Sequence, residues 1–351
     1  VRYRSAQALL ELSRPQPASR FLLRRTQVDG ENGPTVAVGV ENAHLVHTTQ
    51  LLPASRAGNV EEQIRSVLGQ LDALMTGYRT PRSQLVKLNV YVTGRLVRQV
   101  VEKSLESWLP TGCRPAVAHV QTPLADPQAR VAIDAVFPAQ QVQATDGVKH
   151  TPGVQEGRAS RFARSSVLPR GDVVYVSGQA RPGSLSVATT ATMKGLFATL
   201  EFMKVRKQDI VQIKCFANPI KDAATVMDAI ASVFAGETIP PVSLVEWQHS
   251  SLPIEIEVVA WRPGGRSQEP VSFATPPGLS SSPVFSRVAT IHSQNRIYVA
   301  GLHSSGQQAD VSQVKSVFDQ LTSSLSSHRS DLRHLAKATY YVTTPGSSAE
   351  L

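Results

Sequence analysis

The stretch QLVKLNVYVT (84–93) occurs in related form twice more in this chain of 351 residues, as DIVQIKCFAN (209–218) and as HLAKATYYVT (334–343). The step from 84 to 209, and again from 209 to 334, is 125 residues. A second landmark lies upstream of each: AHLVHTTQLLP (43–53), DVVYVSGQARP (172–182) and NRIYVAGLHSS (295–305). A repeat of this length is a whole small domain, because solenoid units span only about 20–50 residues. We therefore predict three tandem copies of one domain.

The pattern within copy one predicts its secondary structure. TVAVGV and HLVHTTQLL read as two strands joined by the turn ENA. Apolar residues between 60 and 75 fall at three- and four-residue steps, which predicts a helix. The strand QLVKLNVYVT, the helix VRQVVEKSLESWL and the closing strands AVAHVQTPL and ARVAIDAVFP follow. Strands and helices mixed in this order predict an α+β fold, with two helices on one face of a mixed sheet.

Composition and the repeat give a domain division. Polar or Pro/Gly/Ser-rich stretches separate the copies and read as linkers. Copy three stops after its landmark strand and lacks the second helix and both closing strands, so we expect the natural chain to be longer, or its end disordered or cut. The apolar face of each sheet needs neighbours, so we expect the copies to form a pseudo-trimer. The predicted units are a leader (1–33), domain 1 (34–138), a linker (139–160), domain 2 (161–261), a linker (262–283) and a partial domain 3 (284–351).

The bulk composition limits the function classes. Hydrophobic residues make up 41% and charged residues 18%, which is typical of a globular protein. Two cysteines provide neither a disulfide framework nor a metal-ligand spacing, which favours a reducing, cytoplasmic compartment. No apolar run approaches the length of a membrane span. The chain has no phosphate-binding loop, dinucleotide fingerprint or zinc motif, so we expect no cofactor and no metal. The net charge of +9 comes from scattered arginines, so a solvated basic surface is favoured over nucleic-acid binding.

The ordered segments in copy two are VYVSGQ, DIVQIKCFAN, IPPVSLVEW and LPIEIEVVAW, and copy one has LVHTTQLLP and CRPAVAH. In this set the chain resembles the RidA/YjgF family, also labelled the L-PSP endoribonuclease family. The resemblance implies chorismate-mutase-like domains that trimerise with sheets inside and helices outside. It also implies ligand pockets at the interfaces, and hydrolysis of 2-imino or 2-enamino acids to 2-keto acids and ammonia.

The resemblance also implies site residues. The carboxylate-binding arginine of the family is replaced by Val117 and Val242, and neither valine can bind a carboxylate. Its nearby cysteine is replaced by His119 in copy one. The family serine at the strand end corresponds to Thr48 and Ser177, and a glycine, Gly178, follows in copy two. The family glutamate corresponds to Glu255 in copy two. We therefore take Glu255, Ser177 and His119 as candidate catalytic residues, and Thr48, Gly178, Val117 and Val242 as candidate ligand-binding residues.

Three functions follow from these residues. The first is a diverged RidA-like protein that binds a small metabolite between domains, with hydrolysis of an imine or enamine without the usual arginine as its candidate activity. The alternative is a non-catalytic ligand-binding or scaffold protein, and the third is an L-PSP-type endoribonuclease. The expected partners are a small-molecule ligand and the neighbouring domains, with a homo-oligomer left open, and no membrane.

Charged residues inside apolar strands give one further expectation. Lys87 and Lys337 recur at matched positions, and burying an unpaired lysine is costly, so we expect each to reach an interface or an ion pair. Glu255 and Glu257 alternate with isoleucines and should share the opposite face of their strand.

Overall fold

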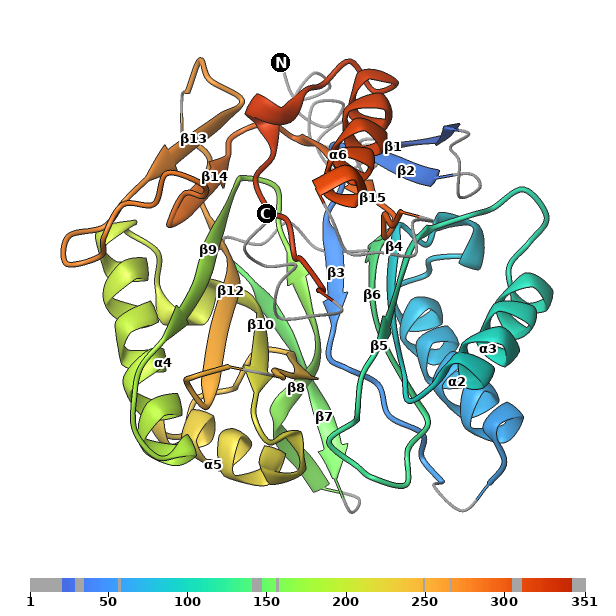
Figure 1. The fold of residues 1–351 in the computed structure, drawn as a ribbon, viewed down its shortest axis with the longest axis horizontal. Coiled ribbons are helices and arrows are strands. Elements are labelled where there is room, and N and C mark those ends of the chain that lie inside the picture. Colours follow the sequence, from blue (N-terminus) through green and yellow to red (C-terminus); the bar gives the residue numbers. More distant parts are fainter. Residues whose placement is uncertain are drawn as a thin grey trace, which may run out of the picture.

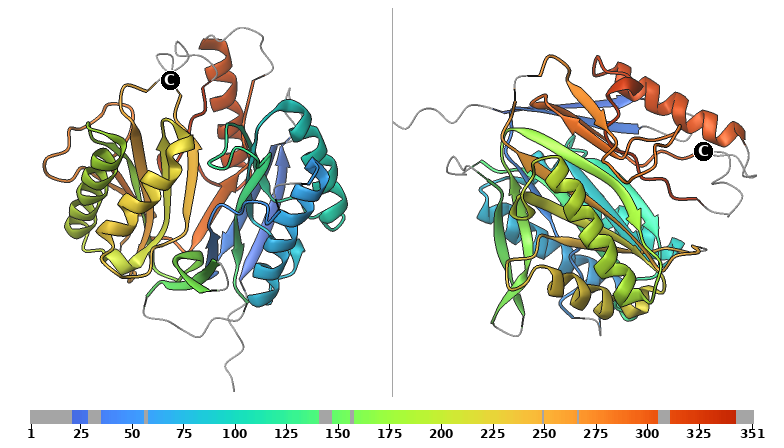
Figure 2. Two further views of the ribbon diagram at one scale, coloured as in Figure 1. Left: turned by 90° about the horizontal axis from the view of Figure 1, so that it is seen from below. Right: turned by 90° about the vertical axis from the view of Figure 1, so that its left-hand side faces the viewer.

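The structure is a computed structural model that describes residues 21–28, 35–55, 58–140, 147–155, 158–248, 250–265, 267–304 and 311–342. Helices lie on the outside, and strands face one another in the middle (Figures 1 and 2). This arrangement confirms the α+β fold class. The helices are α2 (Val60–Gly77), α3 (Arg95–Trp108), α4 (Leu185–Phe202), α5 (Ala223–Val233) and α6 (Val311–Ser326).

The strands form two six-stranded sheets and one three-stranded sheet. The first sheet has the order β5-β4-β6-β3-β8-β7: Ala116–Gln121, Lys87–Val92, Val131–Pro138, Leu45–Thr48, Arg158–Leu168 and Lys149–Gln155. The second has the order β11-β10-β12-β9-β14-β13: Val242–Glu246, Ile210–Ala217, Ile254–Arg262, Asp172–Ala180, Val288–Ile291 and Val271–Ala274. The third has the order β1-β2-β15: Leu22–Val28, Thr35–Glu41 and Asn295–Val299. The shared order of the first two sheets is consistent with copies one and two.

Local sequence explains why α2 forms where the periodicity predicts it. Asn59 caps the helix by accepting a hydrogen bond from the Glu62 main chain, and the Glu62 side chain accepts one from the Asn59 main chain. This reciprocal pair satisfies main-chain donors that the first turn leaves free. The apolar residues then face the first sheet, where Ile64, Val67 and Leu71 are buried.

The hairpins at the start of the copies, β1–β2, β7–β8 and β13–β14, each lie in a different sheet from the strand that follows them. We call these the exchanged hairpins, and the sequence did not predict the exchange. β2 and β3 follow each other across the expected turn but do not pair, because β6 and β8 occupy both edges of β3. β2 instead pairs with β1 and β15. In the same way, β8 pairs with β3 of the first sheet although the strand after it, β9, belongs to the second sheet. β14 likewise pairs with β9 of the second sheet, whereas the strand after it, β15, belongs to the third. Each exchanged hairpin therefore adds two strands to the sheet of another copy.

Three further expectations differ from the structure. The stretches read as linkers contain β7 and β13, and the leader contains β1, because these strands complete the exchanged hairpins. The landmark stretch of copy three forms no strand over 335–342. Its counterparts β4 and β10 each lie between two strands, and the closing strands that would flank it are missing from the described residues. The domain boundaries themselves stay a prediction.

A buried core joins all three sheets. It contains Val38 from the third sheet, Leu45 and Leu168 from the first, and Val173 and Trp261 from the second. Burial of aliphatic side chains from every sheet holds the strands at fixed positions relative to one another. The ends of β3, β9 and β15 can therefore be compared directly.

Candidate functional site

Equivalent residues near the ends of β3, β9 and β15 each donate a main-chain hydrogen bond to the exchanged hairpin that pairs with that strand. The main-chain N–H groups of Thr49, Ser177 and Ala300 donate to carbonyl oxygens of Arg164, Arg287 and Val36 at 2.8, 3.0 and 2.9 Å. Thr49, rather than Thr48, is thus the structural counterpart of Ser177. Thr48 is one residue earlier and fully buried, and its hydroxyl accepts a hydrogen bond from Ala135 N–H at 2.9 Å. The sequence alignment of these strand ends was one residue out of register.

The strand end of copy one is closed by β11 from the second sheet. Gln50 N–H and the Thr49 hydroxyl both donate to the Val242 carbonyl, at 3.1 and 2.8 Å. The Gln50 side-chain amide donates to the Leu244 carbonyl at 3.0 Å and accepts from Leu244 N–H at 3.3 Å. These bonds satisfy the polar groups that a ligand would otherwise use.

The strand end of copy three is closed in the same way by β5 from the first sheet. Gly301 N–H donates to the Val117 carbonyl at 2.9 Å. A Cβ on Gly301 would lie 3.2 Å from the Ala118 Cα, so the absence of a side chain permits this close approach. Val117 and Val242 therefore hold equivalent places, each against the strand end of a different part of the chain.

The strand end of copy two is different, because no strand covers it among the described residues. The Ser177 hydroxyl is buried and has no hydrogen-bond partner in the structure. The carboxylate of Glu255 lies directly over Gly178, where even a methyl group on that glycine would overlap it. Orphaned buried hydroxyls are uncommon in native proteins and call for an explanation. Ser177 directly precedes Gly178 in the chain, so we group these two residues with Glu255 and call them the Glu255 site.

The environment of Glu255 disfavours its charged form. Burial, and then the neighbouring carboxylate of Glu257, raise the pKa of Glu255, while Lys337 opposes them. Lys337 forms an ion pair with Glu257 at 2.5 Å, which confirms that this lysine is paired. Ile254 and Ile256 pack into the core of the second sheet, so the two glutamates share the other face of β12, as predicted. A carboxyl group with a raised pKa is suited to giving and taking protons near neutral pH.

The two valines at the family's arginine positions, Val117 and Val242, make their contacts away from the Glu255 site. Val242 lies against Gln50, and Val117 lies against Gly301. The counterpart that would cover Gly178 is a strand next to 335–342, which is not among the described residues. The loss of arginine at Val117 and Val242 therefore says nothing about a carboxylate bound beside Glu255. The sequence alone leaves open which copies contribute to one pocket, because that depends on how the sheets face one another.

His119 does not join the Glu255 site. It lies on β5, and no hydrogen bond or ion pair links it to Ser177 or Glu255 within the described part of the chain. Its Nε2 is buried without a partner. Burial, followed by the positive charge of Arg98, lowers the pKa of His119, which keeps the ring neutral. Of the three predicted catalytic residues, Glu255 lies against Gly178, the residue that follows Ser177, whereas His119 lies apart on β5.

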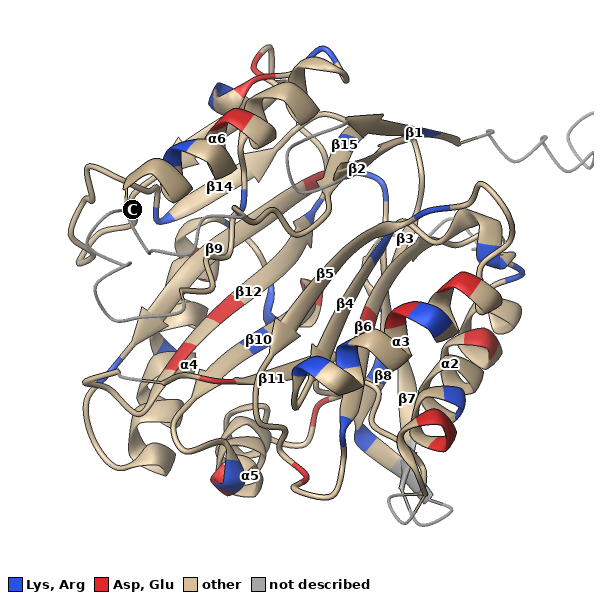
Figure 3. Ribbon diagram, turned by 45° about the vertical axis from the view of Figure 1, so that its right-hand side comes forward, with Lys and Arg blue, Asp and Glu red and all other residues tan. Residues whose placement is uncertain are grey.

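A buried polar cluster between the sheets was not predicted as a unit. Asp134 on β6 accepts hydrogen bonds from Asn89 at 2.6 Å, from the Tyr91 hydroxyl at 2.7 Å and from the Ser243 hydroxyl of β11 at 2.9 Å. The Lys214 ammonium lies over the Tyr91 ring, 5.6 Å from its centre. Figure 3 shows charged positions of both signs on the inner strands β10 and β12. The alternation of polar residues in QLVKLNVYVT was the available signal, since every second residue faces this cluster.

Replacing Gly178 with alanine should displace the Glu255 carboxylate. The new methyl group cannot coexist with the present carboxylate position, so we expect a loss of about 1–3 kcal/mol in the free energy of unfolding. Urea unfolding of the full chain measures this loss. Gly265→Ala is the matched control, because Gly265 is exposed outside any helix or strand and nothing lies within 4 Å of its added Cβ. An unchanged stability for Gly178→Ala would show that the Glu255 side chain turns aside at little cost, so that its position over Gly178 is not firmly held.

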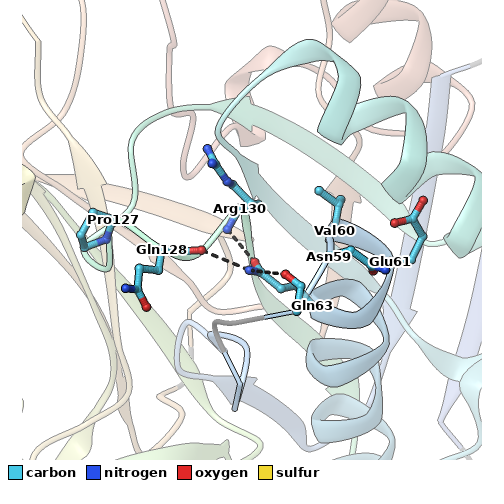
Figure 4. Close-up of a pocket in the computed structure, with 8 residues that line it drawn as sticks. Asn59, Val60, Glu61, Gln63, Pro127, Gln128 and Arg130 are labelled. Atoms are coloured by element: carbon cyan, nitrogen blue, oxygen red, sulfur yellow. Dashed lines mark hydrogen bonds between the residues drawn. The ribbon is translucent and has the colours of Figure 1, made fainter.

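A separate hollow of about 540 Å³ lies at the start of α2 (Figure 4). Gln63 spans it, donating to the Gln128 carbonyl at 3.1 Å and accepting from Arg130 N–H at 2.8 Å. These internal bonds tie α2 to the loop before β6. The residues described in the structure contain no cluster of three or more His, Cys, Asp or Glu side chains placed to hold a metal ion. None of the described helices is long and apolar enough to cross a membrane.

Comparison with known proteins identifies one segment. Residues 158–262 match the family model described as Endoribonuclease L-PSP. No curated protein sequence matches the chain. Similar solved structures include a YjgF-family protein from Neisseria meningitidis (17% identity, 36% of this chain and 100% of that one, TM-score 0.26). Others are a Rid-family protein from Yersinia pestis (17%, 32% and 98%, 0.28) and a yjgF-family protein from Streptococcus pyogenes (18%, 34% and 98%, 0.26). The match of residues 158–262 to this family model agrees with the RidA/YjgF resemblance of the sequence.

Proposed function

We propose that the protein is a RidA-type hydrolase of small imines or enamines, and that the reaction takes place at the Glu255 site. The observation that carries this proposal is the contact of Glu255 with Gly178 beside the unpartnered Ser177 hydroxyl. In this proposal Glu255 is the proton-transferring carboxyl group, and Ser177 contributes a hydroxyl that has no hydrogen-bond partner among the described residues. The proposal includes a pseudo-trimeric arrangement of the three copies, which the exchanged hairpins and shared core support.

The chemistry follows from the state of Glu255. For a protonated imine, the Glu255 carboxylate accepts a proton from water as the water oxygen adds to the carbon of the C=N bond, giving a neutral carbinolamine. The resulting carboxylic acid gives that proton to the nitrogen, and the carboxylate then takes the hydroxyl proton as ammonia leaves and the carbonyl forms. A pKa raised by burial and by Glu257 favours the protonated form that the second step needs. Ser177 has a hydroxyl free to bind the substrate nitrogen or oxygen.

Glu255→Gln should lower turnover at least about 100-fold, because it removes the proton-transferring group while keeping its shape. The assay traps the products of freshly generated 2-imino acids and of neutral imines with semicarbazide, using the full chain. Glu201→Gln, at an exposed position on α4, is the matched control and should retain activity. Turnover that survives Glu255→Gln would contradict the assignment of the site.

A non-catalytic binding or scaffold role is the second candidate, favoured by a specific observation. Two of the three strand ends are closed by main-chain and side-chain hydrogen bonds, through Gln50 and Gly301. Such closure serves assembly and leaves no polar group for a substrate. An absence of turnover with every imine tested, in a correctly folded chain, would support this role over hydrolysis.

A further inference from the structure

Three side chains of the second sheet form a continuous chain of hydrogen bonds. His292 Nδ1 lies 2.9 Å from Oδ2 of Asp172, and His292 Nε2 lies 2.8 Å from the hydroxyl oxygen of Ser272. A neutral imidazole carries its proton on one nitrogen and accepts on the other, so the Asp172 carboxylate holds the proton on Nδ1 and Nε2 accepts from Ser272. This sequence of groups is the one that activates a serine hydroxyl for attack on a carbonyl carbon.

The sheet order explains why these residues meet although they lie far apart in the sequence. β9, β14 and β13 are neighbours in the second sheet (Figure 1). Asp172 begins β9, Ser272 lies on β13, and His292 directly follows β14. Ile291 is in register with Val173 of β9 and with Val271 of β13. His292 is therefore opposite Asp172 and one diagonal step from Ser272, with all three side chains on the same face of the sheet.

The three groups differ in burial in the order that a nucleophilic serine requires. The Asp172 side chain is 1% exposed and the His292 side chain 9%, whereas Ser272 is exposed. Arg262 Nε and Nη2 donate to the same Asp172 oxygen at 3.1 and 3.0 Å, which fixes the carboxylate in its charged form. A buried, oriented carboxylate stabilises the imidazolium that forms when His292 takes a proton, and the hydroxyl at the other end is open to a substrate.

The main chain beside Ser272 supplies a hydrogen-bond donor. His292 N–H donates to the Pro270 carbonyl at 2.9 Å, so by alternation Ser272 N–H faces β14 and Phe273 N–H points to the outer edge of β13. Among the described residues no strand lies beyond β13. The N–H group of the residue after a nucleophilic serine is a suitable donor to the oxyanion that forms on attack.

We propose that Ser272 and His292 are the catalytic residues of a second site, with Asp172 as the positioning residue, and that this site hydrolyses carboxylic esters. Ser272 Oγ forms a bond to the carbonyl carbon while His292 Nε2 takes its proton, and the carbonyl electron pair moves to the oxygen beside Phe273 N–H. The bond to the alcohol oxygen then breaks, and His292 gives its proton to that leaving oxygen.

Water completes the cycle on the acyl-serine. Its oxygen adds to the acyl carbon as His292 takes one of its protons, and the bond to Ser272 Oγ then breaks as His292 returns that proton to Oγ. The products are the alcohol and the carboxylic acid, and no oxidant or further reactant is needed. An ester suits this site better than an amide, because exposed Ser272 offers few remote contacts to supply binding energy and an alcohol leaves more readily than an amine. The inference does not depend on the Glu255 site.

The test uses a fluorophosphonate probe, which phosphorylates serine hydroxyls that a neighbouring base activates. The full chain should take up the probe stoichiometrically, and peptide mapping by mass spectrometry should locate it on Ser272. p-Nitrophenyl acetate should give a stoichiometric burst of p-nitrophenolate as the acyl-serine accumulates. Ser272→Ala should abolish both signals. Ser107→Ala is the matched control, because Ser107 is an exposed serine of α3 whose hydroxyl donates to the Lys103 carbonyl.

The rate of labelling separates catalysis from a structural role of the same hydrogen bonds. His292→Gln should slow phosphorylation of Ser272 at least about 100-fold, because the base that takes its proton is lost. Asp172→Asn should also slow labelling while leaving its final extent unchanged, since the serine and the histidine remain. A structural role alone would change the stability of these variants without a specific label on Ser272 in the unaltered chain.

Two results would overturn the proposal. The folded, unaltered chain could remain unlabelled and show no burst, which would make the three residues a structural connection between β13 and β9. The label could instead map to another residue, or persist in Ser272→Ala. Labelling is measured on the unaltered chain, so a folding defect in His292→Gln leaves the test intact. The ester assay contains no imine, so its outcome is separate from that of the assay for the Glu255 site.

Discussion

Asp134→Ala is expected to lower the free energy of unfolding by about 3–5 kcal/mol, because it removes the acceptor from a buried hydrogen-bonded network. Asn89, Tyr91 and Ser243 all donate to this carboxylate, and Asp134 is only 2% exposed. Its loss leaves the Tyr91 hydroxyl buried without a partner and removes a negative charge near Lys214. The effect should reach both six-stranded sheets, since Ser243 belongs to the second and Asp134 to the first.

Urea unfolding of the full chain measures this change. Asp228→Ala, at an exposed position on α5, is the matched control and should shift stability by no more than about 0.5 kcal/mol. Tyr91→Phe, which removes a single hydrogen bond, should cost about 0.5–1.5 kcal/mol. A loss below about 1 kcal/mol for Asp134→Ala would mean that the network does not hold the sheets together.

Acidification should destabilise the protein through His47, which is 3% exposed on β3. Burial lowers the pKa of His47 to about 4 from an ordinary value of 6.5, although the hydrogen bond that His47 Nδ1–H donates to the Gln212 side-chain oxygen opposes the shift. The unfolded chain therefore binds a proton below pH 6.5 that the folded chain binds only near pH 4. Stability from this residue is complete above pH 6.5 and falls by about 3 kcal/mol as the pH drops to 4.

The free energy of unfolding, measured in urea between pH 4 and 7.5, tests this dependence. His47→Gln should flatten the curve by the share that His47 contributes, because glutamine does not titrate. His334→Gln, outside the buried core, should keep the slope of the unaltered chain. If both variants followed the same curve, His47 would not be the residue responsible.

The sequence predicts the elements of this protein better than their partners. The periodicities identify α2, α3, β4 and β12 because side-chain burial repeats locally along the chain. Pairing is decided elsewhere: β2 joins β15 because β6 and β8 already flank β3. The landmark of copy three matches its counterparts residue by residue, but 335–342 is no strand, since a strand exists only beside another strand.

The candidate site shows the same division. Ser177, Gly178 and Glu255 were found by resemblance, and they meet because β9 and β12 are neighbours in one sheet. The sequence alignment chose Thr48 in place of the equivalent residue, Thr49. The polar run TTQ has no apolar/polar alternation that would fix the register. The sequence identifies the position of Val242 but not its neighbour, because β11 lies against the strand end of another copy, where the Val242 carbonyl accepts from Gln50 N–H.

The exchange of first hairpins has a consequence for how the chain folds and how it can change. β2 and β15 pair although more than 250 residues separate them, from Val38 to Tyr298, so an early and a late part of the described chain meet as adjacent strands. Closing a loop of this length costs conformational entropy before any contact repays it, which makes this pairing a late event. Removing or shuffling one copy alone would leave a gap in the sheet that its hairpin completes. It would also separate that copy's own strands from the hairpin that another copy supplies. An added copy would therefore need new strand pairing with the copies on both of its sides.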